Sequence, residues 1–429
     1  MFGCVFAAAF VTYVQRQSLS VVATRLMPEA GLTTRELSWL FDAFLIFYTL
    51  LQFPGGLLAQ RIGARRLTFG CVLLSTLATA ATGFAPAVAA GTTLLWLLIA
   101  TRAINGIALG PLFPANAGVV QAWYPPHRWA LMNGLQVTGL SLGAAVTPLA
   151  VAAVMQAFGW HAALYATCVP GLLLAAVWLW YVRDTPREHG AVHATELAEI
   201  EPTPRPALPR AGGWTEARRV LTNRNVLLLS LGYLLMNYVF YFFMHWSFLY
   251  LVEERHLTLL QGGSLALIPF LTGSVCASVG GYLCDGACRR LGPRWGFRLV
   301  PLVTLPLAAL LLLLAVRLES PYAAVAALAA CFGCAQMTEA PFWAATFWVA
   351  RERASAATGV LNSGGNIGGI IGTPIVGYLV AAHNWNAAFA TGVGFALASA
   401  ALWLLIDADR GRLGGPAPET ASAPAPAAS

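Results

Sequence analysis

Long apolar runs alternate with short polar segments along almost the whole chain. A helix that crosses a lipid bilayer needs roughly 20 mainly apolar residues, and about twelve runs reach that length. Runs that exceed it imply helices that tilt or extend beyond the membrane. The pattern therefore predicts an all-α polytopic membrane protein with twelve transmembrane helices, at about 1–24, 37–60, 67–87, 92–122, 129–157, 160–182, 225–252, 261–287, 296–317, 320–350, 354–382 and 385–407.

One long polar segment divides these runs into six and six. Its TPRPALP sequence predicts an extended linker, and its ELAEIE sequence predicts at most a short surface helix. The last residues, rich in Pro and Ala, cannot bury enough apolar surface to fold. We therefore expect an N-terminal six-helix bundle at 1–182, a cytoplasmic linker at 183–224, a C-terminal six-helix bundle at 225–407 and a disordered cytoplasmic tail at 408–429.

The composition supports a membrane location. Only 10% of the residues are charged and 58% are apolar, whereas a soluble protein carries about 25% charged residues. The 25 basic residues, all Arg, exceed the 18 acidic ones and give a net charge of +7. In a soluble protein this excess would suggest a nucleic-acid partner, but in a membrane protein arginines collect in the inner loops. We expect the lipid bilayer as a partner and no nucleic acid.

The arginines also predict the orientation. The short loops on one side of the twelve predicted spans hold ten arginines and those on the other side hold four, with seven more in the linker. Because basic residues mark the cytoplasmic side, both termini are expected in the cytoplasm. The first run lacks a preceding basic segment and a cleavage site, so we interpret it as a span and not as a signal peptide. A multi-pass protein of a bacterial-type inner (plasma) membrane is predicted.

A short motif occurs at the same place in each half. GGLLAQRIGARR at 55–66 follows the second run, and GGYLCDGACRRLG at 280–292 follows the eighth. The first copy resembles the loop signature G-x-x-x-D-R-x-G-x-R-R of the major facilitator superfamily, except that Gln60 replaces its Asp. The resemblance implies a gating latch that steadies the outward-facing state, and the residues assigned to it are Gly56, Arg61, Gly63, Arg65 and Arg66 with Asp285, Arg289 and Arg290.

Within this superfamily the chain resembles the anion:cation symporter family, which includes bacterial hexuronate, galactonate and phthalate transporters. The likeness covers nearly the whole chain outside the linker and tail. It implies two six-helix bundles around a central cavity that opens alternately to either side and binds a small organic anion. The residues that carry it lie in 13–20, 42–56, 113–125, 237–242, 339–343 and 359–369, the last containing GGNIGG.

Two arginines lie inside apolar runs. An Arg at the centre of a membrane helix costs on the order of 2.5–3.5 kcal/mol, so Arg16 and Arg102 are expected to face a cavity. Each could instead be neutralised by a nearby carboxylate, but the first, fourth and fifth runs contain none within a few turns. A guanidinium fork suits a carboxylate, and the family resemblance implies that these two arginines bind the substrate's carboxylate.

Further polar residues recur at helical spacing on the predicted spans. They line the cavity in this interpretation, although a Tyr can also fill an interhelical gap and a buried amide can also join two helices. Those in the first half are Tyr13 and Tyr48, and those in the second half are Asn237, Tyr241 and His245 with Asn362 and Asn366.

The sequence departs from the family where proton coupling is concerned. The family's helix-1 Asp is Gln15 here and its helix-4 carboxylate falls at Leu109, and neither residue can carry a proton. Asp42 and Glu339 are the candidates to replace them, followed by His245. Glu339 could equally stabilise a helix through a hydrogen bond.

The chain carries no nucleophile elbow, HExxH motif, phosphate loop or suitably spaced carboxylate pair, so it is not expected to be an enzyme. No cofactor and no metal site are expected, and Cys331 with Cys334 is interpreted as packing. The predicted function is secondary transport of a carboxylate, such as a sugar acid or an aromatic acid, by a monomer that takes it up with a proton or sodium ion. The alternatives are an uncoupled facilitator or exchanger, and a non-transporting anion receptor that signals through the linker.

Overall fold

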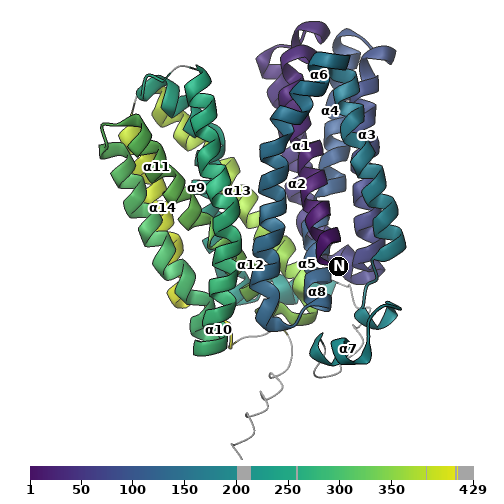
Figure 1. Ribbon diagram of the computed structural model, residues 1–429, viewed down its shortest axis with the longest axis vertical. Coiled ribbons are helices and arrows are strands. Elements are labelled where there is room, and N and C mark those ends of the chain that lie inside the picture. Colours follow the sequence, from purple (N-terminus) through teal and green to yellow (C-terminus); the bar gives the residue numbers. More distant parts are fainter. Residues whose placement is uncertain (201–213, 258, 383, 411–412, 414–429) are drawn as a thin grey trace, which may run out of the picture.

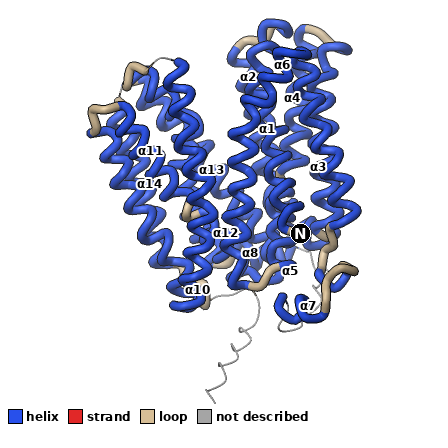
Figure 2. Tube along the Cα trace, viewed as in Figure 1, coloured by secondary structure: helices blue, strands red, loops and turns tan. Residues whose placement is uncertain are grey.

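The structure is a computed structural model that describes residues 1–200, 214–257, 259–382, 384–410 and 413. Figure 2 shows these residues as helices joined by short loops. In the first half the helices are α1 (Phe2–Ala30), α2 (Thr34–Ile62), α3 (Ala64–Val88), α4 (Gly91–Leu109), α5 (Leu112–Trp123) and α6 (Trp129–Tyr181). In the second half they are α9 (Arg224–Leu249), α10 (Leu259–Arg317), α11 (Pro321–Gln336), α12 (Glu339–Ala350), α13 (Ala354–Ala381) and α14 (Trp385–Leu405).

The remaining elements are short. Helices α7 (Ala194–Ile200) and α8 (Trp214–Leu221) lie in the segment between the two halves, and α7 contains most of the surface helix predicted there. Single turns are formed by Pro126–Arg128, Pro186–Glu188, Tyr250–Glu254 and Arg351–Arg353.

The twelve predicted spans are confirmed, although two helices contain a pair of spans each and two spans are broken. Helix α6 turns back at Gly159 (φ 85°) and α10 at Gly292 (φ 74°), positive φ values that glycine adopts without strain. One span comprises α4 and α5, interrupted before Pro111, and another comprises α11 and α12. Eight helical stretches of the described chain are long and apolar enough to cross a membrane. Three of these stretches contain two predicted spans each, so the eight stretches account for eleven spans. Helix α1 is the twelfth.

Each half forms a bundle of six spans, and the bundles stand side by side (Figure 1). We call the end of the molecule at which α7 and α8 lie the linker end. The halves meet where α6 packs on α10 and α2 packs on α13. A Cβ added to Gly359 would lie 2.6 Å from the Gln52 carbonyl oxygen, and one added to Gly281 would lie 2.5 Å from that of Ala130. Glycine therefore lets the backbones of the two halves touch, as in other membrane helix pairs.

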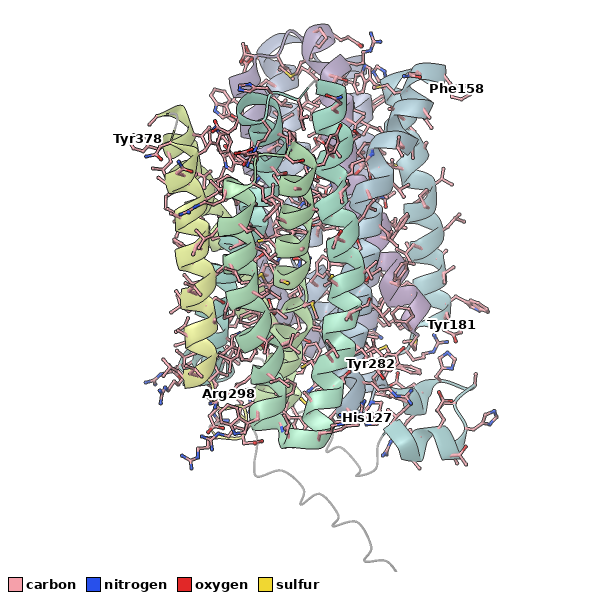
Figure 3. All side chains as sticks on the ribbon, turned by 60° about the vertical axis from the view of Figure 1, so that its left-hand side comes forward. His127, Phe158, Tyr181, Tyr282, Arg298 and Tyr378 are labelled. Atoms are coloured by element: carbon pink, nitrogen blue, oxygen red, sulfur yellow. The ribbon has the colours of Figure 1, made fainter. Side chains whose placement is uncertain are left out.

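The outer surface is apolar, as contact with lipid requires. The side chains of Phe158, Tyr378 and Tyr282 point outward in Figure 3, with exposed fractions of 77%, 79% and 62%. Phe158 and Tyr378 lie near one end of the molecule, and Tyr282 lies nearer the other. Exposed aromatic residues toward both ends are typical of a protein that meets two membrane–water interfaces.

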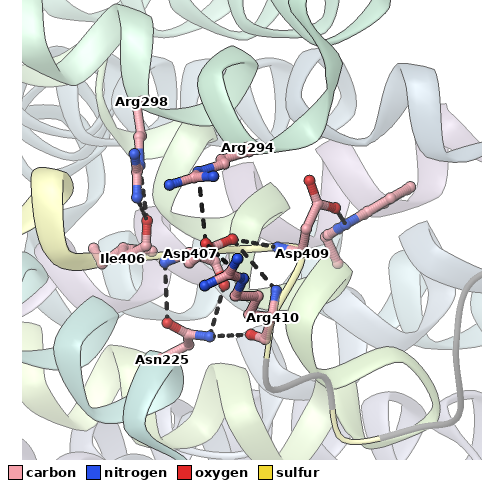
Figure 4. A network of polar contacts seen from close by, with 8 residues as sticks. Asn225, Arg294, Arg298, Ile406, Asp407, Asp409 and Arg410 are labelled. Atoms are coloured by element: carbon pink, nitrogen blue, oxygen red, sulfur yellow. Dashed lines mark hydrogen bonds and ion pairs between the residues drawn. The ribbon is translucent and has the colours of Figure 1, made fainter.

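A polar network stabilises the end of the last helix, α14, at the linker end (Figure 4). The Arg298 guanidinium donates from Nε to the Ile406 carbonyl oxygen at 2.8 Å, which satisfies a carbonyl just beyond the end of α14. Asn225 of α9 donates to the Asp407 carbonyl oxygen at 2.7 Å and accepts from the Asp407 backbone N–H at 3.1 Å. The Arg294 Nε lies 3.5 Å from the Asp407 carboxylate. These bonds join α9, α10 and the end of α14.

The segment predicted as a disordered tail is partly described. The Leu413 N–H donates to the Val349 carbonyl oxygen at 2.9 Å, so the first residues of this segment fold back on the second half. The rest of the predicted tail, at 411–412 and 414–429, and the TPRPALP sequence predicted to be extended, at 203–209, lie outside the described residues.

The network predicts a specific loss of stability. Asn225→Ala removes hydrogen bonds to the Asp407 backbone from a side chain in a residue only 7% exposed. Because each such bond contributes about 1 kcal/mol, the free energy of unfolding should fall by about 2 kcal/mol and the melting temperature in detergent should drop. Arg25→Ala, a change to an exposed residue far from this network, is the control. Equal melting temperatures for the Asn225 variant and the wild type would contradict the assignment.

Candidate functional site

A cavity lies between the two halves, and both halves line it. Its walls combine aromatic rings and amides with one guanidinium and one carboxylate. The lining residues are Tyr13, Arg16, Tyr48, Phe113, Asn133, Gln136, Val137 and Leu140 from the first half, with Tyr233, Asn237, Phe240, Tyr241, Gln336, Glu339, Trp343, Asn362 and Asn366 from the second.

Arg16 is the cation of this cavity, and aromatic rings surround it. Its Nη1 donates to the Tyr13 hydroxyl at 3.3 Å. The guanidinium carbon lies 5.1, 5.0 and 5.2 Å from the ring centroids of Tyr13, Phe44 and Tyr48, distances at which cation–π attraction operates. No carboxylate of the described residues forms an ion pair with it. The guanidinium therefore faces the cavity as a positive group without a counter-ion.

Arg102 packs on the ring of Phe44 and is not among the residues that line the cavity. Its guanidinium carbon is 4.9 Å from the Phe44 ring centroid, and the residue is only 3% exposed and does not line the cavity. Its Nε has no hydrogen-bond partner among the described residues. A Cβ on Gly106 would collide with the Phe44 carbonyl oxygen, so this glycine lets α4 approach α2 and brings Arg102 against that ring. Arg102, which the sequence predicts in the cavity wall, contacts the same ring as Arg16 but is not among the lining residues.

The second half contributes a bonded row of amides and tyrosines. The Tyr241 hydroxyl donates to Asn366 Oδ1 at 2.9 Å, and Asn366 Nδ2 donates to the Asn362 carbonyl oxygen at 2.8 Å. Asn237 Nδ2 donates to the Tyr233 carbonyl oxygen at 3.0 Å. The bond between Tyr241 and Asn366 joins α9 to α13, whereas the other two lie within one helix each.

The GGNIGG run makes this arrangement possible. A Cβ on Gly365 would lie 2.6 Å from the Tyr233 ring, and one on Gly369 would collide with the Tyr241 ring. The two tyrosines therefore pack directly on the glycine surface of α13. The structure brings Asn237, Tyr241, Asn362 and Asn366 together as the sequence analysis expected.

Two further predicted residues lie outside the lining, as Arg102 does. His245 is exposed, and its ring stacks on Tyr241 with centroids 5.8 Å apart and an interplanar angle of 16°. Asp42, the first coupling candidate, is exposed on α2 and does not line the cavity.

Glu339 is the carboxylate of the cavity. It begins α12, where the break after α11 turns the chain, and it is 6% exposed. Its Oε2 accepts from the Tyr233 hydroxyl at 2.8 Å and from Trp343 Nε1 at 3.3 Å. Tyr233 lies 106 positions away along the chain, so this contact is tertiary and not a bond within one helix.

Several lining residues are not among those predicted from the sequence. The side-chain amide oxygens (Oε1) of Gln136 and Gln336 are buried and have no hydrogen-bond partner among the described residues. Both are amides inside apolar runs, a signal that could have identified them. Asn133 lies three residues before Gln136, on the same helix face. Phe113, Phe240 and Trp343 lie in segments that carry the family likeness, and Tyr233 has no distinguishing pattern in the sequence.

The repeated motifs lie where the halves meet at the linker end. Asp285 accepts from the backbone N–H groups of Ala130 at 3.2 Å and Leu131 at 2.8 Å, so it caps the first turn of α6 with a negative charge. In the other copy, Gln60 donates to the Glu352 carbonyl oxygen at 3.3 Å.

The other motif residues make varied contacts. Gly56 lies against the Ser355 backbone, and Gly63 adopts a φ of 89°. The Arg65 N–H donates to Asp184 Oδ1 at 2.8 Å, and Arg289 Nη1 donates to the His127 carbonyl oxygen at 3.3 Å. The exposed arginines of the two motifs are Arg61, Arg66, Arg289 and Arg290.

Comparison with known families identifies the fold. The family model of the Major Facilitator Superfamily matches residues 5–346 and 286–429. The chain belongs to the major facilitator superfamily. The resemblance stated from the sequence is confirmed, as are the fold class and the prediction that the protein is a membrane transporter and no enzyme.

The relatives are transporters of organic acids. The chain is 30% identical to the D-galactonate transporter of Escherichia coli O6:H1 over 96% of its own length and 95% of the relative's. It is 28% identical to the probable sulfoacetate transporter SauU of Cupriavidus necator, over 86% and 84% of the two chains. The crystal structure of the transporter FucP in the outward conformation superposes with a TM-score of 0.70 at 16% identity, covering 95% of this chain and 98% of that one.

The packing of Tyr241 on α13 yields a prediction. Gly369→Ala places a methyl group where the Tyr241 ring lies, so it should displace that ring and weaken its bond to Asn366. We expect a lower melting temperature and a smaller monodisperse fraction after heating, measured by fluorescence-detected size exclusion. Gly70→Ala is the matched control, because nothing lies within 4 Å of its added Cβ. If both variants behaved alike, the ring contact would not be needed for the fold.

Proposed function

We propose that this protein takes up a small hydroxylated organic acid by alternating access, together with a cation. The observation that carries the proposal is the Arg16 guanidinium, which faces a cavity between the two halves and has no carboxylate partner among the described residues. A cation in such a site needs an anion, and its fork of N–H donors matches a carboxylate.

The amides favour a hydroxylated substrate. The buried side-chain amide oxygens of Gln136 and Gln336 can only accept hydrogen bonds, and no described residue donates to them. A sugar acid carries hydroxyl donors for these oxygens, whereas a plain aromatic acid would leave them unpaired at a cost of about 1–3 kcal/mol each. The names of the relatives, which include D-galactonate and hexuronate transporters, point in the same direction.

The cavity residues receive distinct roles in this proposal. Arg16 binds the carboxylate, and Tyr13 and Tyr48 flank it. Arg102, which packs on the Phe44 ring, adds positive potential to the site. The hydroxyl groups of the substrate bond to the second half through Asn237, Tyr241, Asn362 and Asn366.

The transport cycle follows from the contacts between the halves. We place the linker end in the cytoplasm because the arginines concentrate in the loops at that end, which puts both termini there and the protein in an inner-membrane-type bilayer. The contacts of Asp285 with α6 and of Gln60 with the Glu352 backbone then hold the cytoplasmic side closed. Rocking of the two bundles about the bound anion would break them and release the substrate inward. A monomer suffices for this cycle.

A second candidate, uncoupled transport or exchange, is favoured by Gln15. Its amide donates to Thr76 Oγ1 at 2.9 Å and accepts from Ser75 Oγ at 2.9 Å, within the first half and away from the cavity lining. Leu109 is buried and apolar. Neither residue supplies a proton site in the first half.

A ligand panel followed by a flux measurement tests the proposed function. Purified protein should be stabilised against heat by D-galactonate and galactarate, by about 2.7 kcal/mol at 100 times the Kd, and not by benzoate. Proteoliposomes should then exchange external labelled D-galactonate for internal unlabelled substrate. Stabilisation by benzoate alone would contradict the hydroxylated substrate, and tight binding without flux would favour the receptor alternative.

Two variants separate the arginines. Arg16→Ala removes the cation of the cavity lining, and the affinity for D-galactonate should fall about thirtyfold or more, since losing a buried charge partner costs about 2 kcal/mol or more. Arg102→Ala leaves that guanidinium in place and should have a smaller effect. Arg25→Ala, an exposed residue outside the cavity, should bind like the wild type. An unchanged affinity in the Arg16 variant, measured by calorimetry, would refute the assignment.

A further inference from the structure

We propose that Glu339 is the proton-binding group that couples transport, in place of the two carboxylates that the first half lacks. This inference rests on the proposed function and names its coupling ion. Glu339 lies in the second half, is only 6% exposed and lines the same cavity as Arg16.

The donors around Glu339 are all neutral. The Tyr233 hydroxyl donates to Oε2 at 2.8 Å, and Trp343 Nε1 lies 3.3 Å from both Oε2 and the Tyr233 hydroxyl oxygen. No described residue forms an ion pair with this carboxylate. A buried carboxylate held only by neutral donors can exist with or without its proton, because no fixed positive charge keeps it ionised.

Among the described residues, the elements packed against α12 bring no charged side chain to the cavity lining other than Arg16. Helix α13 has no charged residue at all. The part of α6 that lines the cavity contributes amides and apolar side chains. Helix α9 contributes Tyr233 and Tyr241, and the acid of α10, Asp285, binds the α6 backbone at the linker end. Arg16 is the remaining charged residue of the lining.

Acceptors for the bound proton are present in the same cavity. The buried side-chain amide oxygens of Gln136 and Gln336 lack hydrogen-bond partners among the described residues. When the carboxylate takes up a proton from water, one carboxyl oxygen becomes an O–H donor. The cavity thus offers donors to the ionised carboxylate and acceptors to the protonated acid.

The contacts of Oε2 suit a proton better than a metal cation. A hard cation such as Na⁺ needs several oxygen ligands whose lone pairs point toward it. Here Oε2 already faces the hydrogens of a hydroxyl and an indole, and these would point at a cation placed there. A proton needs only one carboxylate lone pair.

The shared cavity explains how the proton and the anion are linked. With Glu339 ionised, an incoming carboxylate meets a negative charge in a poorly screened space. Protonation removes that charge, so each ligand favours the binding of the other by the same factor. The loaded cavity then holds one anion and one proton, and both leave when the cavity opens on the other side.

The first test needs no substrate. The infrared band of a protonated carboxyl group is followed in purified protein as the pH is raised from about 5 to about 9. We expect a carboxyl band that disappears with rising pH in the wild type and is absent in Glu339→Gln, which keeps an oxygen acceptor for Tyr233 and Trp343. Tyr233→Phe, which removes one of these hydrogen bonds, should shift the frequency of that band. A wild-type spectrum without a titrating band that depends on Glu339 or Tyr233 would overturn the proposal.

The second test uses labelled D-galactonate in proteoliposomes. The wild type should accumulate it when the outside is acidic, while Glu339→Gln should keep counterflow and lose accumulation driven by the pH gradient. Asp42→Asn, an exposed carboxylate outside the lining, is the matched control and should accumulate it like the wild type. Accumulation by Glu339→Gln, loss of it in Asp42→Asn, or accumulation driven by a sodium gradient instead would each overturn the proposal. Absence of any D-galactonate flux in the wild type, with the infrared titration intact, would refute the proposed function and leave the proton site standing.

Discussion

The structure depends on a guanidinium that must be stabilised inside a membrane protein without a permanent carboxylate. A fixed ion pair would satisfy Arg16 but would also compete with an anionic substrate. The rings of Tyr13, Phe44 and Tyr48 offer a different solution, because cation–π attraction replaces part of the lost hydration and leaves the N–H donors available. The positive charge therefore keeps a need for an anion, which the transported molecule can satisfy.

This solution requires close contact between helix backbones. Gly106 allows α4 to touch α2 at Phe44, and Gly369 allows α13 to receive the ring of Tyr241. The same device joins the halves, where Gly359 meets the Gln52 backbone. Polar side chains from separate helices can then converge on one cavity, since no Cβ holds the helices apart. The glycines thus fix the geometry of the site although they contribute no polar group to it.

Most of the fold could be predicted from the sequence, because hydropathy reports which segments face lipid. Residues on one helix face, such as Asn237 with Tyr241, could also be assigned to the cavity, since helical spacing fixes their common direction. The position of Arg102 could not, because spacing along α4 does not reveal that its guanidinium packs on the ring of Phe44 from another helix. The contact of Tyr233 with Glu339 could not be predicted from the sequence either, because it depends on how α9 packs against the break before α12.

Gln15 and Leu109 stand where the family has its two relay carboxylates, so the charged residues that remain must have other roles. In the first half, Gln15 is bound to Ser75 and Thr76, so the amide serves the packing of α1 and cannot exchange a proton with the cavity. Arg16 is then left without an acid in its own half. The acid of the cavity is Glu339, across the interface between the two bundles. An anion bound at Arg16 and a proton bound at Glu339 would occupy opposite halves, so the motion that separates the halves would act on both ligands at once.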